Sequence, residues 1–521
     1  MTTKEQAKSF ANAANSKTFA KYLLPGGTWN NWPGRFFRSL LYIVGILLVG
    51  SQLTHATTWY VTQGGRDSNT CTRSKPCAKP DYVANNLARA GDTVSVAAGA
   101  YDYGRAALDV TNSGTATDYI SIVCASRGNC KIKNGVSGNM AVVELAGRYL
   151  KFTGFEVTNY SSQGNNMGFY VTGSNIVINE NTIHHIETDC SDVGGGGIQL
   201  EEFVANITMD SNLIYDIAWP TGGDPKCGKS VRQFDGIIAE TNGAGIIITN
   251  NVVYHVSGGW GVLYGNPKDN MTNPVLIASN TIFSTSNGGI VLPRPSAGSF
   301  LIDNIILDTG VKSYQCGILY DSSVSYNWTH NDLYGNYGGN YCELWGSADQ
   351  IGGPVQPTDI SVNPSLGTTF VHWQSDGSGN YHEAAGSPTI GAGTENCGSK
   401  NPFPICAPTH DFDGNQRGIN GVYDIGAYQN QSTLSMTTHS PLPDGTPGVA
   451  YSHQLTATGG KTPYTWSVTA CSGACDADLG FTSGELLSGT PTNAGASTFT
   501  FKAKDANNNI ATAKLSITIN N

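Results

Sequence analysis

The chain has 521 residues, of which 64 are Gly and only 13% are charged. This length exceeds one ordinary domain, and the abundance of Gly, Thr, Asn, Val and Ile favours strands joined by many turns over helices. Residues 57–521 carry 23 basic and 38 acidic residues, a net charge of −15, which argues against nucleic acid or an anionic membrane surface as a partner.

Residues 1–56 have the features of an export signal. Six Lys and Arg residues precede an apolar core, "LLYIVGILLVG" at 40–50, which is short for a membrane span. "THA", ending at Ala56, supplies the small residues of a cleavage site. We predict a cleaved signal peptide, no membrane span in the mature chain, and a secreted or cell-surface protein. An uncleaved signal anchor is the alternative, because the basic segment is long.

All twelve Cys residues follow residue 56. An even number of Cys in an exported protein favours disulfides. No CxxC pair recurs and His rarely lies nearby, which argues against zinc. Pairing sequence neighbours gives six candidate bridges: Cys71–Cys77, Cys124–Cys130, Cys190–Cys227, Cys316–Cys342, Cys397–Cys406 and Cys471–Cys475.

Residues 57–430 are predicted to form a solenoid. Short apolar runs at 58–69, 91–104 and 118–129 are expected to be its first turns. The segment 80–90, "PDYVANNLARA", is expected to be a short helix that covers the N-terminal end, because an open solenoid end exposes strand edges.

Two ladders of residues repeat through this segment in the same phase. One is an Asn ladder that begins with Phe155 in the Asn position and has spacings of 26, 31, 39, 29, 24 and 27 residues. The other is a Gly that opens a further short run in each unit. Each unit holds three short strands whose apolar faces only stacking can bury. We therefore predict an all-β fold, a right-handed parallel β-helix in which the Asn side chains bond to one another at a turn where Asn tolerates left-handed geometry. The ladder positions are Asn181, Asn212, Asn251, Asn280, Asn304 and Asn331, and Gly168, Gly197, Gly236, Gly261, Gly289 and Gly317.

Two motifs support this fold by resemblance. "GDTVSVAAGAYDYG" at 91–104 is similar to the opening turn of the pectate-lyase-like β-helix proteins that bacteria export, and "DFDGNQRGINGVYDIGAYQ" at 411–429 resembles a closing motif of bacterial β-helix surface proteins. Residues 58–430 are thus identified as similar to that superfamily. Its members include polysaccharide lyases, glycoside hydrolases, epimerases and proteins of unknown role, so the resemblance implies the fold without choosing an activity.

Residues 431–521 are predicted to form an immunoglobulin-like β-sandwich. The stretches 442–468 and 486–519 alternate apolar and polar residues, with turn signals between them. They resemble the immunoglobulin-like repeats at the ends of bacterial surface proteins. The resemblance implies a role in spacing or attachment, with Trp466 in the core.

Carboxylates on successive units form the first candidate site. Glu201 and Glu240 each stand four residues after a ladder Gly, so we expect them on adjacent rungs and facing solvent, and Asp235 is close in sequence. Stacked carboxylates repel one another unless a cation or a base lies between them. We predict that Glu201, Glu240 and Asp235 bind Ca²⁺, which would bridge the protein to a uronate carboxylate.

The longest insertions, at 187–196 and 218–234, enter the same strand. Long loops on a rigid solenoid commonly carry binding residues. Lys229, and after it Arg232, is the predicted base that removes the proton alpha to a uronate carboxylate.

A second polar column stands four residues after each ladder Asn and includes His185, Asp216 and His255. Such a column suits an acid/base group or a transition-metal site, and the alternative is an exposed polar stripe. We predict that His185 and His255 contact substrate.

Aromatic residues next to these columns are candidate sugar-binding residues. Trp219, Trp260 and Tyr264 are predicted to stack on sugar rings, because aromatic faces pack against apolar ring faces. The alternative is that these rings only cover the coil.

The combined prediction is an exported carbohydrate-active protein that resembles a polysaccharide lyase and acts on an acidic polysaccharide by β-elimination. The alternative is a non-catalytic surface protein that binds a glycan or serves in adhesion. No P-loop, dinucleotide fingerprint or GxSxG element occurs, which argues against nucleotide and serine-hydrolase chemistry.

Overall fold

The structure, a computed structural model, describes most of residues 56–521, and residues 1–55 of the predicted signal lie outside the described part. No helix in the described ranges is long and apolar enough to cross a membrane. Within 56–521 the description leaves out residues 105, 134–140, 160–166, 187–194, 219–233, 266–272, 294–295, 313–314, 345–349, 352–356, 364–368, 385–386, 397–401, 419–422, 431–433, 459–462, 477, 505–509 and 521.

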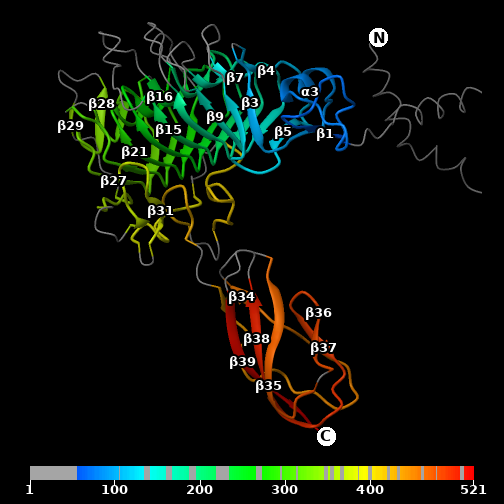
Figure 1. Ribbon diagram of the computed structural model, residues 1–521. Helices are drawn as coiled ribbons and strands as arrows, with labels where there is room; N and C mark the ends of the chain where they lie inside the picture. Colours follow the sequence, from blue (N-terminus) through cyan, green and yellow to red (C-terminus); the bar gives the residue numbers. More distant parts are fainter. Residues whose placement is uncertain are drawn as a thin grey trace, which may run out of the picture. The chain divides into compact units, whose positions relative to one another are not determined.

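Three long sheets, here named A, B and C, are built by successive coils of the chain (Figure 1). Each coil contributes one strand to sheet A, the next to sheet B and the next to sheet C, and equivalent strands of neighbouring coils pair in parallel. At the end of sheet C, β29 runs antiparallel to β28. The fold is therefore the parallel β-helix that the sequence predicts, with rungs about 4.8 Å apart.

The strands of the three sheets are short. Sheet A contains β1 (Thr58–Val61), β2 (Thr93–Val96), β5 (Ile120–Cys124), β8 (Leu150–Thr153), β11 (Ile176–Asn179), β14 (Ile207–Asp210), β17 (Ile246–Thr249), β20 (Val275–Ala278), β23 (Phe300–Ile302) and β26 (Asn327–Thr329). Sheet B contains β3 (Gly99–Asp102), β6 (Cys130–Lys133), β9 (Phe155–Asn159), β12 (Thr182–Ile186), β15 (Leu213–Ile217), β18 (Val252–Val256), β21 (Thr281–Thr285), β24 (Ile305–Leu307) and β27 (Asp332–Tyr334). Sheet C contains β4 (Leu108–Val110), β7 (Ala141–Leu145), β10 (Met167–Val171), β13 (Gly195–Leu200), β16 (Phe234–Ala239), β19 (Trp260–Tyr264), β22 (Gly288–Leu292), β25 (Ile318–Asp321), β28 (Tyr341–Leu344) and β29 (Gln350–Ile351).

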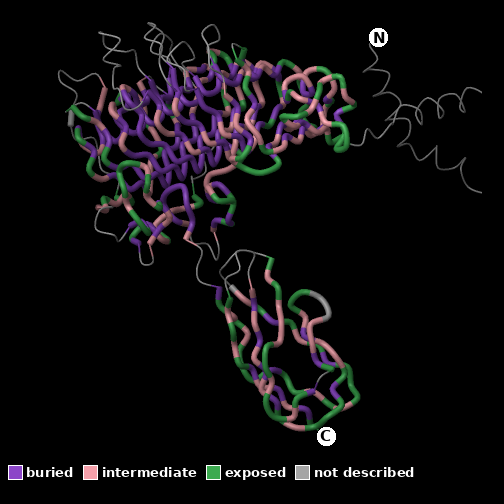
Figure 2. Tube along the Cα trace, in the orientation of Figure 1, coloured by how far each residue is buried: buried purple, intermediate pink, exposed green. Residues whose placement is uncertain are grey.

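The core lies between the sheets, and alternate residues of each strand point into it. In β14, for example, Ile207 and Met209 have no exposed area, while Thr208 between them is half-buried. Figure 2 shows this buried interior as a continuous band along the coils. No single coil could bury these side chains alone, so stacking supplies the core.

The predicted Asn ladder is present, between sheets A and B. Each ladder side chain donates from Nδ2 to Oδ1 of the Asn one coil further on, over 3.0–3.1 Å. The bonds join Asn181 to Asn212, Asn212 to Asn251, Asn251 to Asn280, Asn280 to Asn304 and Asn304 to Asn331. The Asp359 carboxylate ends the ladder by accepting the backbone N–H of Asn331 at 2.9 Å.

The ladder corrects one expectation about this turn. Left-handed backbone geometry occurs at the residue before each ladder Asn, as at Ser211 (φ 53°), Asn250 (φ 54°) and Ser279 (φ 55°), and not at the ladder Asn itself. The ladder positions therefore need Asn for its paired donor and acceptor rather than for its tolerance of positive φ.

The Gly ladder marks where sheet C approaches its neighbours. An added Cβ at Gly236 would lie 2.5 Å from both the Gly261 carbonyl oxygen and a Val253 methyl group. A side chain cannot fit there without moving backbone, because real Cβ contacts are longer and the interior is close-packed. The repeated Gly is thus a packing requirement of the coil.

Helix α3 (Pro80–Asn86) lies at the N-terminal end of the solenoid, as predicted (Figure 1). Its Val83 and Ala84 are buried against the first coil. The helix is shorter than the predicted segment 80–90, because the backbone at Leu87 leaves helical geometry.

The segment 369–430 folds back along the outside of the coils. Its hairpin of β30 (Phe370–His372) and β31 (Asn380–Glu383) packs on sheet B, where the Tyr381 ring lies 4.6 Å from that of Phe283. Further on, His410 bonds to Asp210 at 2.8 Å. Described residues of the motif at 411–429 also contact the side of the solenoid, because Arg417 Nε donates to Asn250 Oδ1 at 3.1 Å.

Residues 435–519 form antiparallel sheets with a core of their own, which includes Leu487 and Phe501. Trp466 is partly buried against this core. The strands are β32 (Ser435–Met436), β33 (Tyr451–Gln454), β34 (Ala457–Thr458), β35 (Thr465–Gly473), β36 (Gly480–Ser483), β37 (Leu486–Gly489), β38 (Gly495–Lys504) and β39 (Ile510–Ile519).

Four of the six predicted disulfides are confirmed: Cys71–Cys77, Cys124–Cys130, Cys316–Cys342 and Cys471–Cys475. The other two pairs include residues outside the described ranges and stay predictions. Disulfides of this number fit a protein of an oxidising, extracellular compartment.

Asp332 is expected to make stability depend on pH. Its side chain has no exposed area, one carboxylate oxygen accepts only the Val362 N–H, and burial raises its pKa to about 7. A pKa that is higher in the folded state than in the unfolded state means that stability falls as pH rises from about 4 to about 7. The free energy of unfolding of the wild type should therefore decrease over this pH range. Replacing Asp332 with Asn should remove up to about 4 kcal/mol of that decrease.

Thermal unfolding at pH 5 and pH 8 checks this prediction. The melting temperature of the wild type should fall from pH 5 to pH 8, and this fall should be larger than the fall in D332N. The matched control is D102N, because Asp102 is exposed and bonds from Gly104 and Lys133 lower its pKa. An identical pH response of D332N and the wild type would contradict the assignment.

Candidate functional site

Three of the predicted site residues lie outside the described ranges. Trp219, Lys229 and Arg232 all fall within 219–233. Their assignments as a sugar-stacking ring and as candidate bases stay predictions.

Glu201 and Glu240 occupy the positions that the repeat predicts. Leu200 pairs with Ala239 across β13 and β16, so the residues that follow each of them stand on adjacent rungs. Leu200 and Ala239 point into the core, and the alternation of a strand then turns the next side chains outward. Glu201 is exposed and Glu240 is half-buried. The two carboxylates therefore face outward from sheet C, one coil apart.

Asp235 does not join this pair. It is the second residue of the strand that Glu240 follows, and five residues of extended chain span roughly 16 Å. Its side chain is 2% exposed, and Oδ1 accepts the Trp260 N–H at 2.6 Å. The prediction of a cluster of three carboxylates is wrong for Asp235, because closeness in sequence along a strand means separation in space.

The described residues do not complete a calcium site. Ca²⁺ takes six to eight oxygen ligands, and Glu201 and Glu240 supply only part of such a set. Among the described residues, no group of three or more His, Cys, Asp or Glu side chains is arranged to hold a metal ion. Calcium binding thus stays a prediction, and no chemical step is assigned to it.

Trp260 and Tyr264 are packed into the coil. Tyr264 has no exposed area, and its hydroxyl donates to the Asn273 carbonyl at 2.9 Å. Trp260 is 7% exposed and its ring fills the space beside Gly288. These placements do not fit rings that stack on a sugar. They fit the alternative, that the two residues cover the coil.

Two further carboxylates on sheet C, those of Asp109 and Glu144, were not among the predicted site residues. The register aligns Asp109 with Glu144, then Tyr170, then Gln199 on successive rungs of the outer face. Burial raises the pKa of Asp109, helped by Asp81, and burial and Asp109 raise that of Glu144. Continuing the phase of the Gly ladder towards the N-terminus would have found this column.

The same column becomes apolar in later coils. Ile238, Leu263, Val291 and Leu319 follow on successive rungs after Gln199. They form a buried apolar cluster on the outer side of sheet C. The outer face therefore has a polar part at β4 to β13 and an apolar part at β16 to β25.

The predicted column on sheet B is assembled by the fold. His185, Asp216 and His255 share left-handed backbone geometry, with φ of 50°, 52° and 51°. The Asp216 carboxylate lies 3.0 Å from His255 Nδ1 through Oδ1 and 3.8 Å from His185 Nε2 through Oδ2. Equal backbone geometry on adjacent rungs thus brings the three side chains together.

The two histidines of this column differ in access. The His185 side chain is 39% exposed. His255 is buried under the segment 369–430, and its Nε2 lies 2.9 Å from the Ser375 carbonyl. Direct contact with a substrate fits His185 and does not fit His255.

Neighbouring side chains extend the column. His184 Nδ1 lies 2.6 Å from His185 Nδ1, and His184 Nε2 lies 2.9 Å from Glu156 Oε1. Lys131 Nζ reaches the same oxygen at 2.7 Å. The His184 ring is also stacked on Tyr215, with the ring centres 4.9 Å apart.

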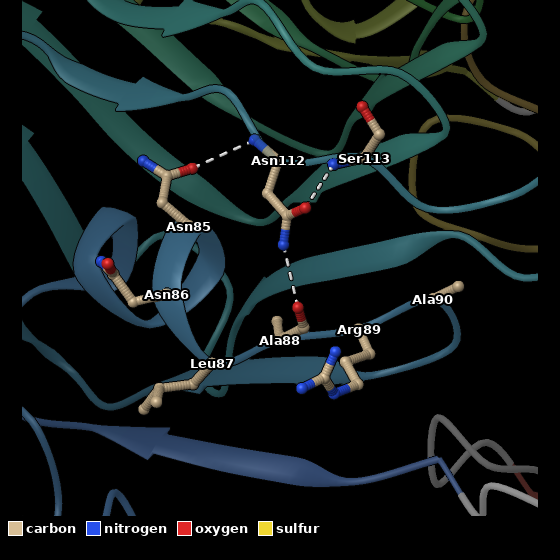
Figure 3. Close-up of a pocket in the computed structure, with 8 residues that line it drawn as sticks. All are labelled: Asn85, Asn86, Leu87, Ala88, Arg89, Ala90, Asn112 and Ser113. Carbon is tan, nitrogen blue, oxygen red and sulfur yellow. Dashed lines mark hydrogen bonds between the residues drawn. The ribbon is translucent and has the colours of Figure 1, made fainter.

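A small hollow lies elsewhere, beside α3, with a volume of about 320 Å³ (Figure 3). Asn112, which lines it, donates from Nδ2 to the Ala88 carbonyl at 2.8 Å, and its own N–H bonds to Asn85. These amides hold the cap to the first coil. The hollow shares no residue with the columns on sheets B and C.

No protein-family model matches the chain, and no curated protein matches it. Among solved structures, the chain is similar to pectate lyase Pel9A, at 17% identity, with 73% of this chain and 98% of that chain covered and a TM-score of 0.42. It is similar to a GH136 lacto-N-biosidase from Eubacterium ramulus at 15% identity, with 59% and 60% covered and a TM-score of 0.44. A rhamnogalacturonan lyase matches at 14% identity, with 59% and 87% covered and a TM-score of 0.35. The strand order and register above assign the fold by themselves: the described coils form a parallel β-helix.

Proposed function

We propose that the protein is a carbohydrate-active enzyme that binds an acidic polysaccharide on the outer face of sheet C and cleaves it by β-elimination. The observation that supports the proposal most is the position of Glu201 and Glu240, outward and one coil apart. The resemblance of residues 58–430 to exported β-helix proteins is consistent with it.

Charge makes this proposal specific. Two outward carboxylates one rung apart repel each other and repel a uronate unless a cation neutralises them. Binding of a uronate polymer is therefore expected to require an added divalent cation. Lys229, or Arg232, is the proposed base that removes the proton alpha to the uronate carboxylate.

The test is ultraviolet absorbance of unsaturated uronates, measured with purified protein and a panel of acidic polysaccharides, with calcium and with a chelator. We expect product only with calcium, and a loss of at least about 100-fold in E201Q/E240Q and in K229M. The matched control is E485Q, because Glu485 is an exposed residue of the turn between β36 and β37, and its substitution should leave the rate unchanged.

Two results would overturn the proposal. One is no absorbance change with any polysaccharide of the panel. The other is turnover that E201Q/E240Q leaves unchanged. Glycan binding without turnover, unaffected by the same substitutions, would instead favour the non-catalytic surface protein.

A further inference from the structure

The described residues of the segment 369–430 enclose a cluster of buried charges against the solenoid. Its Arg417 is surrounded by four carboxyl groups, those of Asp303, Glu383, Asp411 and Asp424. None of these five residues exposes more than 5% of its area, and with every group ionised the cluster would carry a net charge of −3. Such a buried excess of charge is strongly unfavourable, so the cluster takes up a proton or a cation. In the described ranges, no group of three or more His, Cys, Asp or Glu is arranged to hold a metal ion, which favours a proton.

Three of the four carboxyl groups accept backbone N–H donors, which favour the ionised form. The Thr394 N–H lies 3.1 Å from both carboxylate oxygens of Asp303. Burial raises the pKa of Asp303 and of Asp424, and their N–H donors oppose the increase. The donors to the other two aspartates are the N–H groups of Asp413, Asn415 and Gln429 for Asp411, and those of Gly391 and Asn430 for Asp424.

Glu383 differs from the three aspartates. Its Oε2 is buried and has no hydrogen-bond partner among the described residues. Burial raises the pKa of Glu383 well above its ordinary value, Asp424 adds to the increase, and Arg417 opposes it. The Arg417 guanidinium itself donates to the Asn250 amide and to backbone carbonyls. Glu383 is thus the carboxyl group that holds the proton, because a neutral carboxyl group costs less to bury than a carboxylate.

Two tyrosines and a second arginine also act on this cluster. Tyr428 interacts electrostatically with Glu383 and with Arg127, and Tyr423 interacts with Asp303. Burial raises the pKa of both tyrosine hydroxyl groups, and the nearby carboxylates add to the increase. Neither the tyrosines nor Arg127 therefore change charge between pH 5 and pH 9.

His410 joins the same segment to sheet A. Its Nε2 lies 2.8 Å from Oδ2 of Asp210, the last residue of β14, and its carbonyl accepts from Arg417 Nε at 3.2 Å. The bond to Asp210 raises the pKa of His410, although burial opposes this effect. Asp411 adds to the increase and Arg417 reduces it. Protonated His410 therefore forms an ion pair between the segment and the solenoid.

Protons on Glu383 and His410 stabilise the closed segment in the same direction. The ordinary pKa values of the two side chains are 4.5 and 6.5, and the contacts above raise both. A group whose pKa is higher in the folded state binds its proton more tightly there. Its contribution to stability is complete below the ordinary pKa and is lost as pH rises through the raised value.

We propose that the segment 369–430 is a pH-sensitive strap, which is closed over sheet B while Glu383 and His410 hold their protons and detaches as pH rises. On ionisation, Glu383 gives its proton to water, keeps the electron pair of the broken O–H bond and repels the neighbouring carboxylates. His410 also gives its proton to water, and its ion pair with Asp210 is lost.

Detachment uncovers aromatic residues on the outer face of sheet B. With the strap closed, Tyr254 is 7% exposed and Phe283 has no exposed area. The Tyr381 ring of the strap lies 4.6 Å from the Phe283 ring, and the Ser375 carbonyl lies 2.9 Å from His255 Nε2. This apolar surface is thus open to solvent only when the strap is detached.

Hydrogen exchange of the whole protein from pH 5 to pH 9, corrected for the intrinsic rate, measures detachment. The amides to follow join the strap to the solenoid: Gly426 N–H donates to the Asp303 carbonyl at 2.7 Å, and Ala427 N–H donates to Thr281 Oγ1 at 3.0 Å. We expect their protection to decrease at least about tenfold over this range, which corresponds to one unit of pKa. The Asn251 N–H, in the Asn ladder, is the internal reference and should change less.

Two variants assign the effect to the proposed groups. E383Q is neutral at every pH, so its strap should stay at least about tenfold better protected at pH 9 than that of the wild type. H410Q should lose protection at pH 5 and approach the wild type at pH 9. The matched control is E395Q, because Glu395 is an exposed carboxylate of the same segment.

Three results would overturn the proposal. One is protection of the strap amides that does not depend on pH in the wild type. Another is the same pH dependence in E383Q and in the wild type. The third is a change in protection at pH 9 on adding calcium or a chelator, which would assign the neutralising charge to a cation.

Discussion

Replacing Asn251 with Ala is expected to lower the free energy of unfolding of the solenoid by about 4 kcal/mol, because the ladder loses buried bonds in both directions. Asn251 Oδ1 accepts from the N–H and the Nδ2 of Asn212, and Asn251 Nδ2 donates to the Met209 carbonyl and to Asn280 Oδ1. Alanine cannot replace these bonds. The N–H and Nδ2 of Asn212, the Met209 carbonyl and Asn280 Oδ1 each lose the bond to Asn251 while they stay buried. Each costs about 1–3 kcal/mol when its bond cannot be replaced.

Differential scanning calorimetry checks this result. The transition of the solenoid should move to a markedly lower temperature, and any separate transition of the C-terminal sheets should not move. The matched control is N86A, because the Asn86 side chain is exposed at the end of α3 and bonds only to the Tyr82 carbonyl one turn earlier. Equal shifts in N251A and N86A would show that the ladder contributes no special stability.

Replacing Arg417 with Met is expected to detach the segment 369–430 at neutral pH. The Arg417 side chain is buried and donates to Asn250 Oδ1 at 3.1 Å and to the carbonyls of Asp424 and Gly426 at 3.3 and 2.5 Å. Four acidic residues surround its charge: Asp303, Glu383, Asp411 and Asp424. Removing one partner of a buried charge group costs about 3–5 kcal/mol.

The stability that R417M loses relative to the wild type should be smaller at pH 5 than at pH 8. Burial raises the pKa of Asp303, Glu383 and Asp424, while Arg417 opposes this increase. Without Arg417 these pKa values rise further, so the folded variant binds protons more tightly and loses stability as pH increases. Limited proteolysis of the segment at both pH values measures the effect, with R148M, an exposed arginine, as the control. Cleavage of R417M at the wild-type rate at pH 8 would contradict this role.

The local pattern of the candidate sites could be predicted, but their surroundings could not. The phase of the Gly ladder correctly places Glu201 and Glu240 on adjacent rungs, because the side chains of a strand alternate with a fixed period. The same phase correctly places Asp216 between His185 and His255. It does not predict that His255 lies under Ser375, since that contact spans 120 residues of chain.

Strand geometry places two of the predicted site residues, Asp235 and Tyr264, away from the predicted site. Asp235 lies five residues before Glu240, and the extended chain places it near the opposite end of strand β16. Tyr264 lies in the Gly-led run, where the alternation of the strand turns it into the core. Position along the strand decides the case of Asp235, and the side of the pleat decides that of Tyr264.

The sequence by itself determined the coil-on-coil architecture, because a repeat of Asn and Gly in one phase is satisfied only when each unit stacks on the next. Only the tertiary structure decided which polar groups stay open to solvent and which donate or accept. The segment 369–430 covers His255 but leaves His185 exposed, and Glu156 Oε1, 28 residues earlier in the chain, lies 2.9 Å from His184 Nε2. Burial and proton placement depend on contacts between residues that are distant in the chain, which a local repeat does not encode.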